Sequence, residues 1–547
     1  MANRPTSIWT PFLFAVTLAA GLFIGYRLQN KAALVVSGNA GIVSSSNGRV
    51  EELLEYIDAG YVDEADTEVL SEVAIRAILD ELDPHSSFIP ADQVRAIAES
   101  MEGNFDGIGI EFLVVEDTIT VVSAMPGGPS ATAGVQSGDQ IIMVEDSVVT
   151  GVTEYGIDPA SLMKGKSGTD VRITVRRPGR KEPLEFNLQR APIPVVSVDA
   201  AYKLDENTAY VKINRFSATT ADEFTKALEE QLEKKGGHSI VIDLRDNPGG
   251  YLQQATRILS QLFPQKGELL VYTEGRNSRR YEYKTNGRAF YNIRNVAVLI
   301  DEGSASASEI VAGAVQDHDR GIVVGRRSFG KGLVQEQYGL SDGSALRLTV
   351  ARYYTPSGRS IQRSYEEGED SYRGDINRRY DSGELFSGDD AGRDSSLIYY
   401  TDSGHPVFGG GGITPDYFIP LDTTLNNETF LRLRAEIPAY LFTYLRRNPR
   451  VKQYANFEDY RDYFRPNLDA IIADLRPRAQ ESYDEVLDPL PYRLRADLGQ
   501  YFRARLARQL FDNSAYHEII NEDDPMVREA LRLLNGSNPL VEARERE

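Results

Sequence analysis

The chain has 547 residues, a formal net charge of −21 and no cysteine. The acidic balance argues against nucleic-acid binding, because phosphate binding needs clustered Lys and Arg. The absence of cysteine excludes disulfides, thiolate metal sites and thiol nucleophiles. Five scattered histidines leave little material for a His-based metal centre or a Ser-His-Asp triad. The length predicts about three or four domains.

The first expected element is an apolar segment, Ser7–Tyr26, which carries no charge over 20 residues. That length suits a helix that crosses the hydrocarbon layer, and the aromatic residues near its two ends suit the membrane interfaces. No convincing cleavage site follows, so we interpret the segment as an uncleaved anchor rather than a signal peptide. Residues 32–48 are rich in Gly and Ser, and residues 1–48 are therefore expected to form a transmembrane anchor and spacer.

Residues 49–102 are predicted to be helical, because apolar residues recur there at helical spacing. Residues 103–190 are predicted to be a β-rich module, since short alternating runs such as 119–123 and 171–175 are separated by turns that contain Gly or Pro. Together they indicate an α+β protein of several domains.

Strand-like and helix-like runs alternate over residues 191–422, which is typical of an α/β layer. Within it, residues 364–395 are polar and rich in Gly and Asp, so we expect an exposed insertion. Residues 423–547 are predicted to form a helical extension.

Two glycine-rich turns in the α/β region have the same arrangement, in which an expected strand leads through the turn into an expected helix. An apolar run ending at Asp243 leads through the turn 244–250 into an expected helix, and a run ending at Asp301 leads through 302–309 into another. This arrangement leaves backbone N–H groups unpaired at the helix start, where the helix dipole favours negative charge. Such a turn can bind a phosphate, or it can stabilise the oxyanion that forms when a serine attacks a carbonyl.

The second turn carries three candidate nucleophiles, Ser304, Ser306 and Ser308. His318 is a poor base for them, because it lies past the far end of the same expected helix. Lys331, between two glycines, is the other option, and Gln335 could hold its amine. A lysine base must be neutral, and burial can lower its pKa from about 10.4 far enough. Taken alone, such Ser and Lys residues are more often solvated loop residues.

Three motifs stand out in this part of the chain: DLRDNPGG at 243–250, GSASASEI at 303–310 and SFGKGLVQ at 328–335. Together they resemble the carboxyl-terminal processing peptidases, also called tail-specific proteases. That resemblance implies a Ser-Lys endopeptidase with a ClpP/crotonase-like α/β core and an inserted PDZ domain. It extends over about residues 50–420.

The resemblance assigns Ser306 as the nucleophile, Lys331 as the general base and then acid, and Gln335 as the group that orients the lysine. The spacing of 25 and then 4 residues among the three matches the family. Ser304 and Ser308 are rivals, and only the family alignment prefers Ser306 to them.

The oxyanion hole would combine the N–H of Ala307 with an amide from Gly249 or Gly250, and the sequence leaves the choice of glycine open. Asp317 matches another acidic position of the family, which we interpret as structural. His85 lies outside the catalytic motifs, and we expect it to cap or pack the helical region.

The β-rich module resembles a PDZ domain in two stretches. One is the segment 131–142. The other is a loop formed by Gly107, Ile108, Gly109 and Ile110, whose successive N–H groups would bind a chain-terminal carboxylate. A β-edge at 111–115 would pair with the extended peptide. Some relatives carry an Arg proposed to sense peptide occupancy where this chain has Lys164, so gating of the active site by the PDZ domain stays open.

The function that follows is a membrane-anchored serine endopeptidase that recognises the accessible C-termini of protein substrates and cleaves internal bonds near them. It needs no metal and no organic cofactor, and it binds no nucleic acid. The family likeness places residues 27–547 in the periplasm or otherwise outside the cytoplasm, and a homodimer through the N-terminal helices is possible. The alternative is a PDZ scaffold or adaptor whose peptidase fold no longer cuts.

Overall fold

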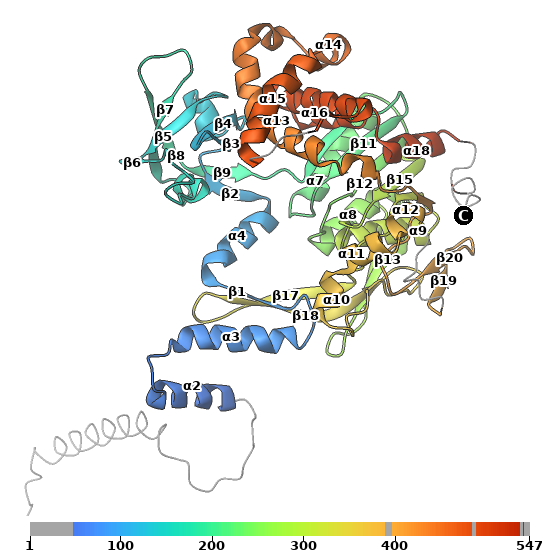
Figure 1. Ribbon diagram of the computed structural model, residues 1–547. Helices are drawn as coiled ribbons and strands as arrows, with labels where there is room; N and C mark the ends of the chain where they lie inside the picture. The colour runs from blue at the N-terminus through green and yellow to red at the C-terminus, as the bar shows by residue number, and fades with distance from the viewer. Residues whose placement is uncertain (1–47, 389–395, 484–487, 537–539, 541–547) are drawn as a thin grey trace, which may run out of the picture. The chain divides into compact units, whose positions relative to one another are not determined.

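The computed structural model describes residues 48–388, 396–483, 488–536 and 540. The chain divides into two compact units, 1–75 and 76–547, and each is described by itself. The described part of the first unit contains the helix α2 (Arg49–Gly60) and the beginning of α3 (Thr67–Asp80) (Figure 1). The expected membrane anchor, Ser7–Tyr26, lies outside the described residues. Among those that are described, no helix is both long and apolar enough to cross a bilayer.

The centre of the second unit is a six-stranded sheet. Its first two strands are antiparallel and all its other neighbours are parallel. The middle strands are continuous apolar runs because helices cover both of their faces, and every residue of β12 is buried. In sheet order the strands are β10 (Val198–Lys203), β11 (Thr208–Ile213), β12 (Ser239–Asp243), β15 (Asn295–Ile300), β16 (Ile322–Gly325) and β21 (Tyr417–Phe418).

Three helices pack on one face of this sheet and one helix packs on the other. Alternate residues of the strands enter two different apolar clusters, one shared with α7, α8 and α9 and one shared with α18. Figure 1 shows α18 in red beside β15. The bounds are α7 (Thr220–Leu228), continued by a π-helix (Glu229–Lys234), then α8 (Leu252–Leu262), α9 (Ala307–Asp317) and α18 (Pro525–Leu534).

A second sheet of five strands adjoins this core and carries the lysine motif. Its order is β1-β18-β13-β14, and β17 also pairs with β18. Because β1 pairs with β18, residues 87–89 from the start of the unit lie beside residues 345–347. The strands are β1 (Ser87–Ile89), β13 (Lys266–Glu274), β14 (Tyr281–Asn286), β17 (Leu333–Gly339) and β18 (Ala345–Tyr354).

The β-rich module begins and ends at one point, because β2 (Asn104–Gly107) pairs with β9 (Ala191–Pro194). The short helix α4 (Ala91–Glu102) precedes it. Between β2 and β9 lies an antiparallel sheet with its own apolar core, in which β3 is an edge strand. Its elements are β3 (Ile110–Val115), β4 (Thr118–Ala124), α5 (Pro129–Ala133), β5 (Gln140–Val144), β6 (Ser147–Val148), α6 (Pro159–Met163), β7 (Asp170–Arg176) and β8 (Leu184–Gln189).

The described part of the polar stretch 364–395, residues 364–388, is largely exposed, but a few of its side chains are buried against the core. Tyr372, Arg379 and Leu385 are only 3–4% exposed. Three of its charged residues, Asp375, Arg379 and Glu384, are buried and form ion pairs, and composition alone cannot distinguish them from the exposed ones. The described elements are α10 (Glu369–Arg373), α11 (Asp375–Asp381) and α12 (Glu384–Ser387), and a hairpin of β19 (Ile398–Tyr400) and β20 (Pro406–Phe408) follows them.

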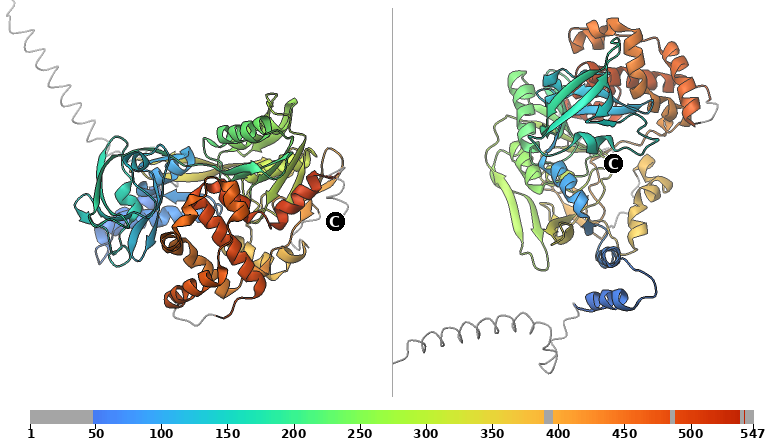
Figure 2. Two further views of the ribbon diagram at one scale, coloured as in Figure 1. Left: turned by 90° about the horizontal axis from the view of Figure 1, so that it is seen from above. Right: turned by 90° about the vertical axis from the view of Figure 1, so that its left-hand side faces the viewer.

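Residues 423–483 and 488–520 are mostly helical and have an apolar core of their own. Figure 2 shows these orange and red helices gathered into one bundle. Side chains of Asn427, Asn456 and Asp512 cap three of the helix starts. The elements are two 3₁₀ turns (Thr423–Leu425 and Pro449–Gln453), α13 (Glu428–Arg447), α14 (Phe457–Tyr463), α15 (Leu468–Tyr483), α16 (Tyr492–Leu510) and α17 (Asn513–Ile520). The chain is therefore an α+β protein of several domains.

Candidate active site

The turn between β15 and α9 presents one serine at the start of a helix. Ser306 is the residue before α9 and has a φ of +56°, which is rare for a residue with a side chain. Residues are held in this region only where the surroundings fix them, and such positions cluster at functional sites. The following N–H, that of Ala307, belongs to the first turn of the helix and is therefore free of an intrahelical acceptor.

The two rival serines are enclosed in the protein. Ser304 and Ser308 have no exposed surface, whereas Ser306 is partly exposed. The Ser304 hydroxyl donates to the carbonyl of Leu244 at 2.8 Å, and the Ser308 hydroxyl donates to that of Asn247 at 2.9 Å. Only Ser306 is therefore accessible to a substrate.

The first glycine turn lies directly against the serine turn. A Cβ at Gly249 would lie 2.6 Å from the carbonyl oxygen of Ala305 and 2.9 Å from the nitrogen of Ala307, and φ there is +95°. The Gly249 N–H donates to Asn247 Oδ1 at 2.9 Å. In the described part of the chain, the N–H of Gly250 has no acceptor. Gly250 and Ala307 are therefore the better pair of donors for an oxyanion.

Asn247 holds the two turns together, a role that the sequence did not reveal. It is fully buried, and its Nδ2 donates to the carbonyl of Ile213 at 2.9 Å. Its own carbonyl accepts from the N–H of Ala305 at 2.9 Å and from the Ser308 hydroxyl. Its side chain thus binds its own loop and a neighbouring strand, and it fixes the two turns against each other.

The amine of Lys331 lies in a half-buried site and donates to Gln335 Oε1 at 2.9 Å. Burial lowers the pKa of Lys331, and the positive charge of Arg347 lowers it further. Both effects favour the neutral amine that a general base requires. Within the described residues, no hydrogen bond joins the Lys331 amine to the Ser306 hydroxyl, and catalytic hydrogen bonds often tighten only in the substrate complex.

A buried carboxylate joins the serine turn to the lysine loop. Glu309 has no exposed surface and accepts from the N–H groups of Ser306, Gly330 and Lys331 at 2.8, 2.8 and 2.9 Å. The hydroxyl of Ser328 is a fourth donor. Burial raises the pKa of Glu309 to about 7, and these hydrogen bonds oppose the rise. The pattern Ser-x-x-Glu is a helix-capping signal, so the sequence did carry a clue to this residue.

Tyr353 makes a second bridge between the same two segments. Its hydroxyl donates to the carbonyl of Ser306 at 3.0 Å and also to that of Lys331. It is 1% exposed, and burial raises its pKa well above the ordinary value, so it remains a neutral donor. No local pattern in the sequence indicates this role, because Tyr353 belongs to β18.

His85 does not merely pack within the helical region, as the sequence led us to expect. Its backbone carbonyl accepts from Gln335 Nε2, and its ring nitrogen Nε2 lies 2.7 Å from the hydroxyl of Tyr372. Burial, and then the charge of Lys331, lowers the pKa of His85 to about 4, so the ring is neutral at physiological pH. Asp83 fixes this turn by accepting from the N–H of His85 at 2.9 Å.

Two other residues lie at the far end of α9. Asp317 forms an ion pair with Arg359 at 2.7 Å in which both side chains are buried, which fits a structural role. His318 follows the last residue of the helix, as expected, and contacts Asp402 and the carbonyl of Leu269. Neither is in a position to act as the base for Ser306.

The expected carboxylate-binding loop connects β2 to β3. Ile108 and Ile110 are buried, and Gly109 has a φ of +72°. The N–H groups of Ile108 and Gly109 have no acceptor in the described part of the chain. Since β3 is an edge strand, free N–H groups and an unpaired strand edge lie next to each other, as peptide recognition by β-addition requires.

No group of three or more His, Cys, Asp or Glu in the described ranges could hold a metal ion. The accessible Ser306 hydroxyl and the half-buried Lys331 amine are suited to acyl transfer by a serine with a lysine base.

Two family models match the chain: Peptidase family S41 over residues 207–368 and the PDZ domain over residues 107–188. A carboxy-terminal-processing protease of Bartonella bacilliformis is 36% identical over 355 residues, which cover 63% of this chain and 80% of the relative. The carboxy-terminal processing protease CtpB of Bacillus subtilis is 37% identical over 322 residues, which cover 58% of this chain and 65% of the relative.

Among solved structures, a photosystem II D1 C-terminal processing protease matches with 28% identity and a TM-score of 0.33. The match covers 58% of this chain and 91% of that one. The PDZ domain of a carboxy-terminal protease from Vibrio cholerae, solved with a peptide, matches 16% of this chain and 97% of its own length, with 26% identity and a TM-score of 0.15.

Proposed function

We propose a Ser306–Lys331 mechanism and recognition of C-terminal tails for this chain. The chain belongs to peptidase family S41 and is a carboxy-terminal processing serine peptidase with a PDZ domain. Its catalytic activity is supported by these relatives, and the alternative of an inactive scaffold is not. We also assign its α/β core to the ClpP/crotonase-like class, a proposal that rests on the sheet and on the serine at the start of α9.

The reaction begins when Ser306 Oγ attacks the carbonyl carbon of the scissile peptide bond. The neutral amine of Lys331 takes the hydroxyl proton, and the N–H groups of Ala307 and Gly250 stabilise the oxyanion. The lysine then gives its proton to the departing amine, which leaves an ester on Ser306. A water molecule, deprotonated by the same amine, hydrolyses that ester and restores both residues. The hydrogen bond between serine and lysine forms as substrate binds.

One observation carries this assignment. Of three serines in one turn, only Ser306 is accessible. The chain places a half-buried lysine amine with a lowered pKa on the loop that Glu309 and Tyr353 join to that turn. Gln335 acts as a positioning residue, because its Oε1 accepts from the Lys331 amine.

The substrate would be a protein with an accessible C-terminus. Its terminal carboxylate would accept hydrogen bonds in the loop Gly107–Ile110, and the residues before it would pair with the edge of β3. Recognition through backbone and carboxylate depends little on side-chain charge, so the net charge of the enzyme does not restrict its substrates.

Two substitutions test the mechanism with an unfolded protein that ends in an apolar tail as the substrate. We expect Ser306→Ala and Lys331→Arg each to lower the rate of cleavage by at least about 1000-fold, since arginine keeps the charge but cannot deprotonate. Lys284→Arg, an exposed lysine on β14, is the matched control. Equal cleavage by wild type and either active-site variant would refute the Ser-Lys assignment.

We further propose that residues 1–48 anchor the protein in the membrane, with the catalytic region outside the cytoplasm. The uncharged segment Ser7–Tyr26 supports this proposal. Added protease should digest residues 27–547 in cells whose outer layer is permeabilised and whose inner membrane is intact. Protection under those conditions would reverse the orientation.

Pairing of two protomers through the N-terminal helical region is a further proposal. Several large apolar side chains of α2 and α3 are exposed, among them Leu53, Tyr56 and Val73. Sedimentation of the fragment 49–547 should give twice the monomer mass, and a monomer at all concentrations would exclude the pairing.

A further inference from the structure

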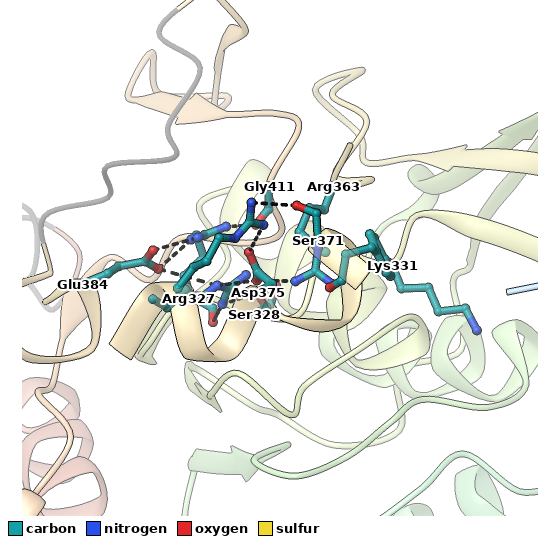
Figure 3. Close-up of polar contacts among 12 residues, drawn as sticks. Arg327, Ser328, Lys331, Arg363, Ser371, Asp375, Glu384 and Gly411 are labelled. Atoms are coloured by element: carbon teal, nitrogen blue, oxygen red, sulfur yellow. Dashed lines mark hydrogen bonds and ion pairs between the residues drawn. The ribbon is translucent and has the colours of Figure 1, made fainter. Parts of the chain in front are cut away.

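The lysine loop, residues 326–332, contains neither helix nor strand. Its conformation is therefore fixed by side chains that reach it from other segments. Some of these side chains come from α10 and α11. The two helices span residues 369–381, just beyond the end of the S41 match at residue 368. Figure 3 shows this network beside Lys331, whose side chain extends away from it.

Arg379 of α11 binds the backbone at the start of the lysine loop. It is 3% exposed, and its Nη1 donates to the carbonyls of Arg327 and Ser328, both at 3.0 Å. An ion pair with Asp375 at 2.7 Å holds the guanidinium in this orientation. The hydroxyl of Ser328 in turn donates to Glu309, which binds the N–H groups on both sides of the active site.

Tyr372 of α10 is connected to the lysine amine by a chain of hydrogen bonds. Its hydroxyl lies 2.7 Å from Nε2 of His85, and the His85 carbonyl accepts from Nε2 of Gln335. Oε1 of Gln335 accepts from the amine of Lys331 at 2.9 Å. The Tyr372 ring also lies edge-on to Phe329, which is itself part of the lysine loop.

We propose that Tyr372 and Arg379 are positioning residues for catalysis, which hold the Lys331 amine and its loop in place. Neither residue touches the substrate or the reacting atoms; each acts through the hydrogen bonds described above. The inference rests on the Ser-Lys mechanism proposed in the preceding section. It assigns a role in catalysis to α10 and α11, which lie beyond the residues that match the S41 family model.

The positioning also affects the charge state of Lys331. Glu309 and Asp83 favour its charged form, whereas burial and Arg347 favour the neutral one. His85 is neutral here and faces Lys331, Asp83 and Arg363. Removing the Tyr372 hydroxyl would release the His85 ring, and we expect the ring to move and admit water to the amine. Because burial is the main cause of the lowered pKa of Lys331, that pKa would rise.

The test compares Tyr372→Phe with Tyr380→Phe, an exposed tyrosine of the same segment, on a peptide substrate across the pH range. We expect Tyr372→Phe to lower kcat about tenfold with KM nearly unchanged. The acid limb of its pH profile should move to higher pH, and Tyr380→Phe should match wild type. If the substitution only reduced the fraction of folded protein, kcat would fall equally at every pH and the acid limb of the profile would stay at the same pH. An unmoved limb would therefore overturn the inference for Tyr372.

Arg379→Lys keeps the positive charge but has a single nitrogen, so it cannot reproduce both the two carbonyl contacts of Nη1 and the separate ion pair of Nε with Asp375. The matched control is Arg378→Lys, an arginine of the same helix that is 53% exposed. We expect a loss of kcat of about tenfold for Arg379→Lys and wild-type kinetics for Arg378→Lys. Equal kcat for the two variants would overturn the role of Arg379.

A double-mutant cycle tests the connection itself. If Tyr372 acts through His85, the losses in kcat of Tyr372→Phe and His85→Ala should not multiply in the double variant. His85→Gln, whose amide can still bond to the tyrosine hydroxyl, should retain more activity than His85→Ala. Multiplicative losses would contradict the chain of hydrogen bonds. Ser306→Ala is assayed in parallel, because cleavage by that variant would show that the mechanism itself has failed.

Discussion

The serine turn and the lysine loop are built in two different ways. Ser306 is fixed by backbone geometry: a buried strand, a tight turn and a helix that begins one residue later. Lys331 belongs to a loop without regular structure, held by Glu309, Tyr353, Arg379 and other side chains from distant parts of the sequence. The half of the site that carries the proposed nucleophile therefore rests mainly on backbone turns, and the half that carries the proposed base is held by side chains from many parts of the fold.

This difference predicts how the two halves respond to mutation. Changes in the serine half should act through the backbone and abolish catalysis without moving the pKa of the base. Each change in the lysine half should lower the rate only partly and alter the pH profile, because each side chain contributes only part of the contacts that position Lys331. The following predictions test that contrast.

Beyond the substitutions of Ser306 and Lys331 themselves, the largest effect is expected for Gly249→Ala, which acts on the serine half. The new methyl group would lie 2.6 Å from the Ala305 carbonyl and would push the glycine turn away from the nucleophile. Loss of an oxyanion donor typically costs about 100- to 1000-fold in kcat, and we expect a loss of that size. Gly267→Ala is the control, since it has a similar positive φ with open space around it. Equal kcat in both variants would show that the close approach is not needed.

Glu309→Gln should break the connection between the halves. The amide would turn a donor toward N–H groups that are donors themselves, so we expect kcat to fall about 100-fold. The pKa of the carboxyl is raised to about 7, so it gains a proton as the pH falls through 7. All four groups that face it are donors, and a protonated carboxyl must lose one of them.

The wild-type enzyme should consequently lose activity as the pH falls through about 7, with the neutral fraction of Lys331 falling in the same direction. In Glu309→Gln, protonation of Lys331 alone should cause the loss of activity at low pH. A profile of kcat from pH 5 to 10 should therefore show a shallower acid limb than that of wild type. Glu230→Gln, an exposed carboxylate, serves as the control. An unchanged limb would show that Glu309 does not titrate in this range.

Tyr353→Phe should have a smaller effect. It removes one hydroxyl that donates to the carbonyls of Ser306 and Lys331, while Glu309 still joins the same segments. We expect a loss in kcat of about tenfold and a lower free energy of unfolding, because two carbonyls lose a buried donor. Tyr354→Phe is the adjacent control. A loss as large as that of Ser306→Ala would mean that Tyr353 takes part in the chemistry directly.

The same contrast explains what the sequence could predict. The strand, turn and helix around Ser306 follow from residues that are adjacent in the chain, so their position was predicted and α9 begins at Ala307. The lysine and glutamine were identified through family likeness, and the structure brings their side chains together. Their roles in catalysis stay predictions until the variants are measured.

What the sequence could not show depends on contacts between distant segments. His85 and Gln335 are 250 residues apart, and no periodicity connects them. The burial of Tyr372 and Arg379 was missed for a related reason: a charged stretch has the same composition whether its charges face water or pair with one another inside the protein. Pairing of buried charges is visible only once the fold is known.

The smallest effects are expected for the two enclosed serines of the nucleophile turn. Ser308→Ala removes a donor to the Asn247 carbonyl, which still accepts from the N–H of Ala305, so activity should stay within about threefold of wild type. Ser304→Ala also leaves the N–H of Asp301 without its acceptor and should lower the free energy of unfolding by about 1–3 kcal/mol. Hydrolysis of a peptide substrate and thermal unfolding measure the two outcomes separately. If either variant folds normally and is as inactive as Ser306→Ala, then accessibility has selected the wrong serine, and the serine half of the site is not the local structure described above.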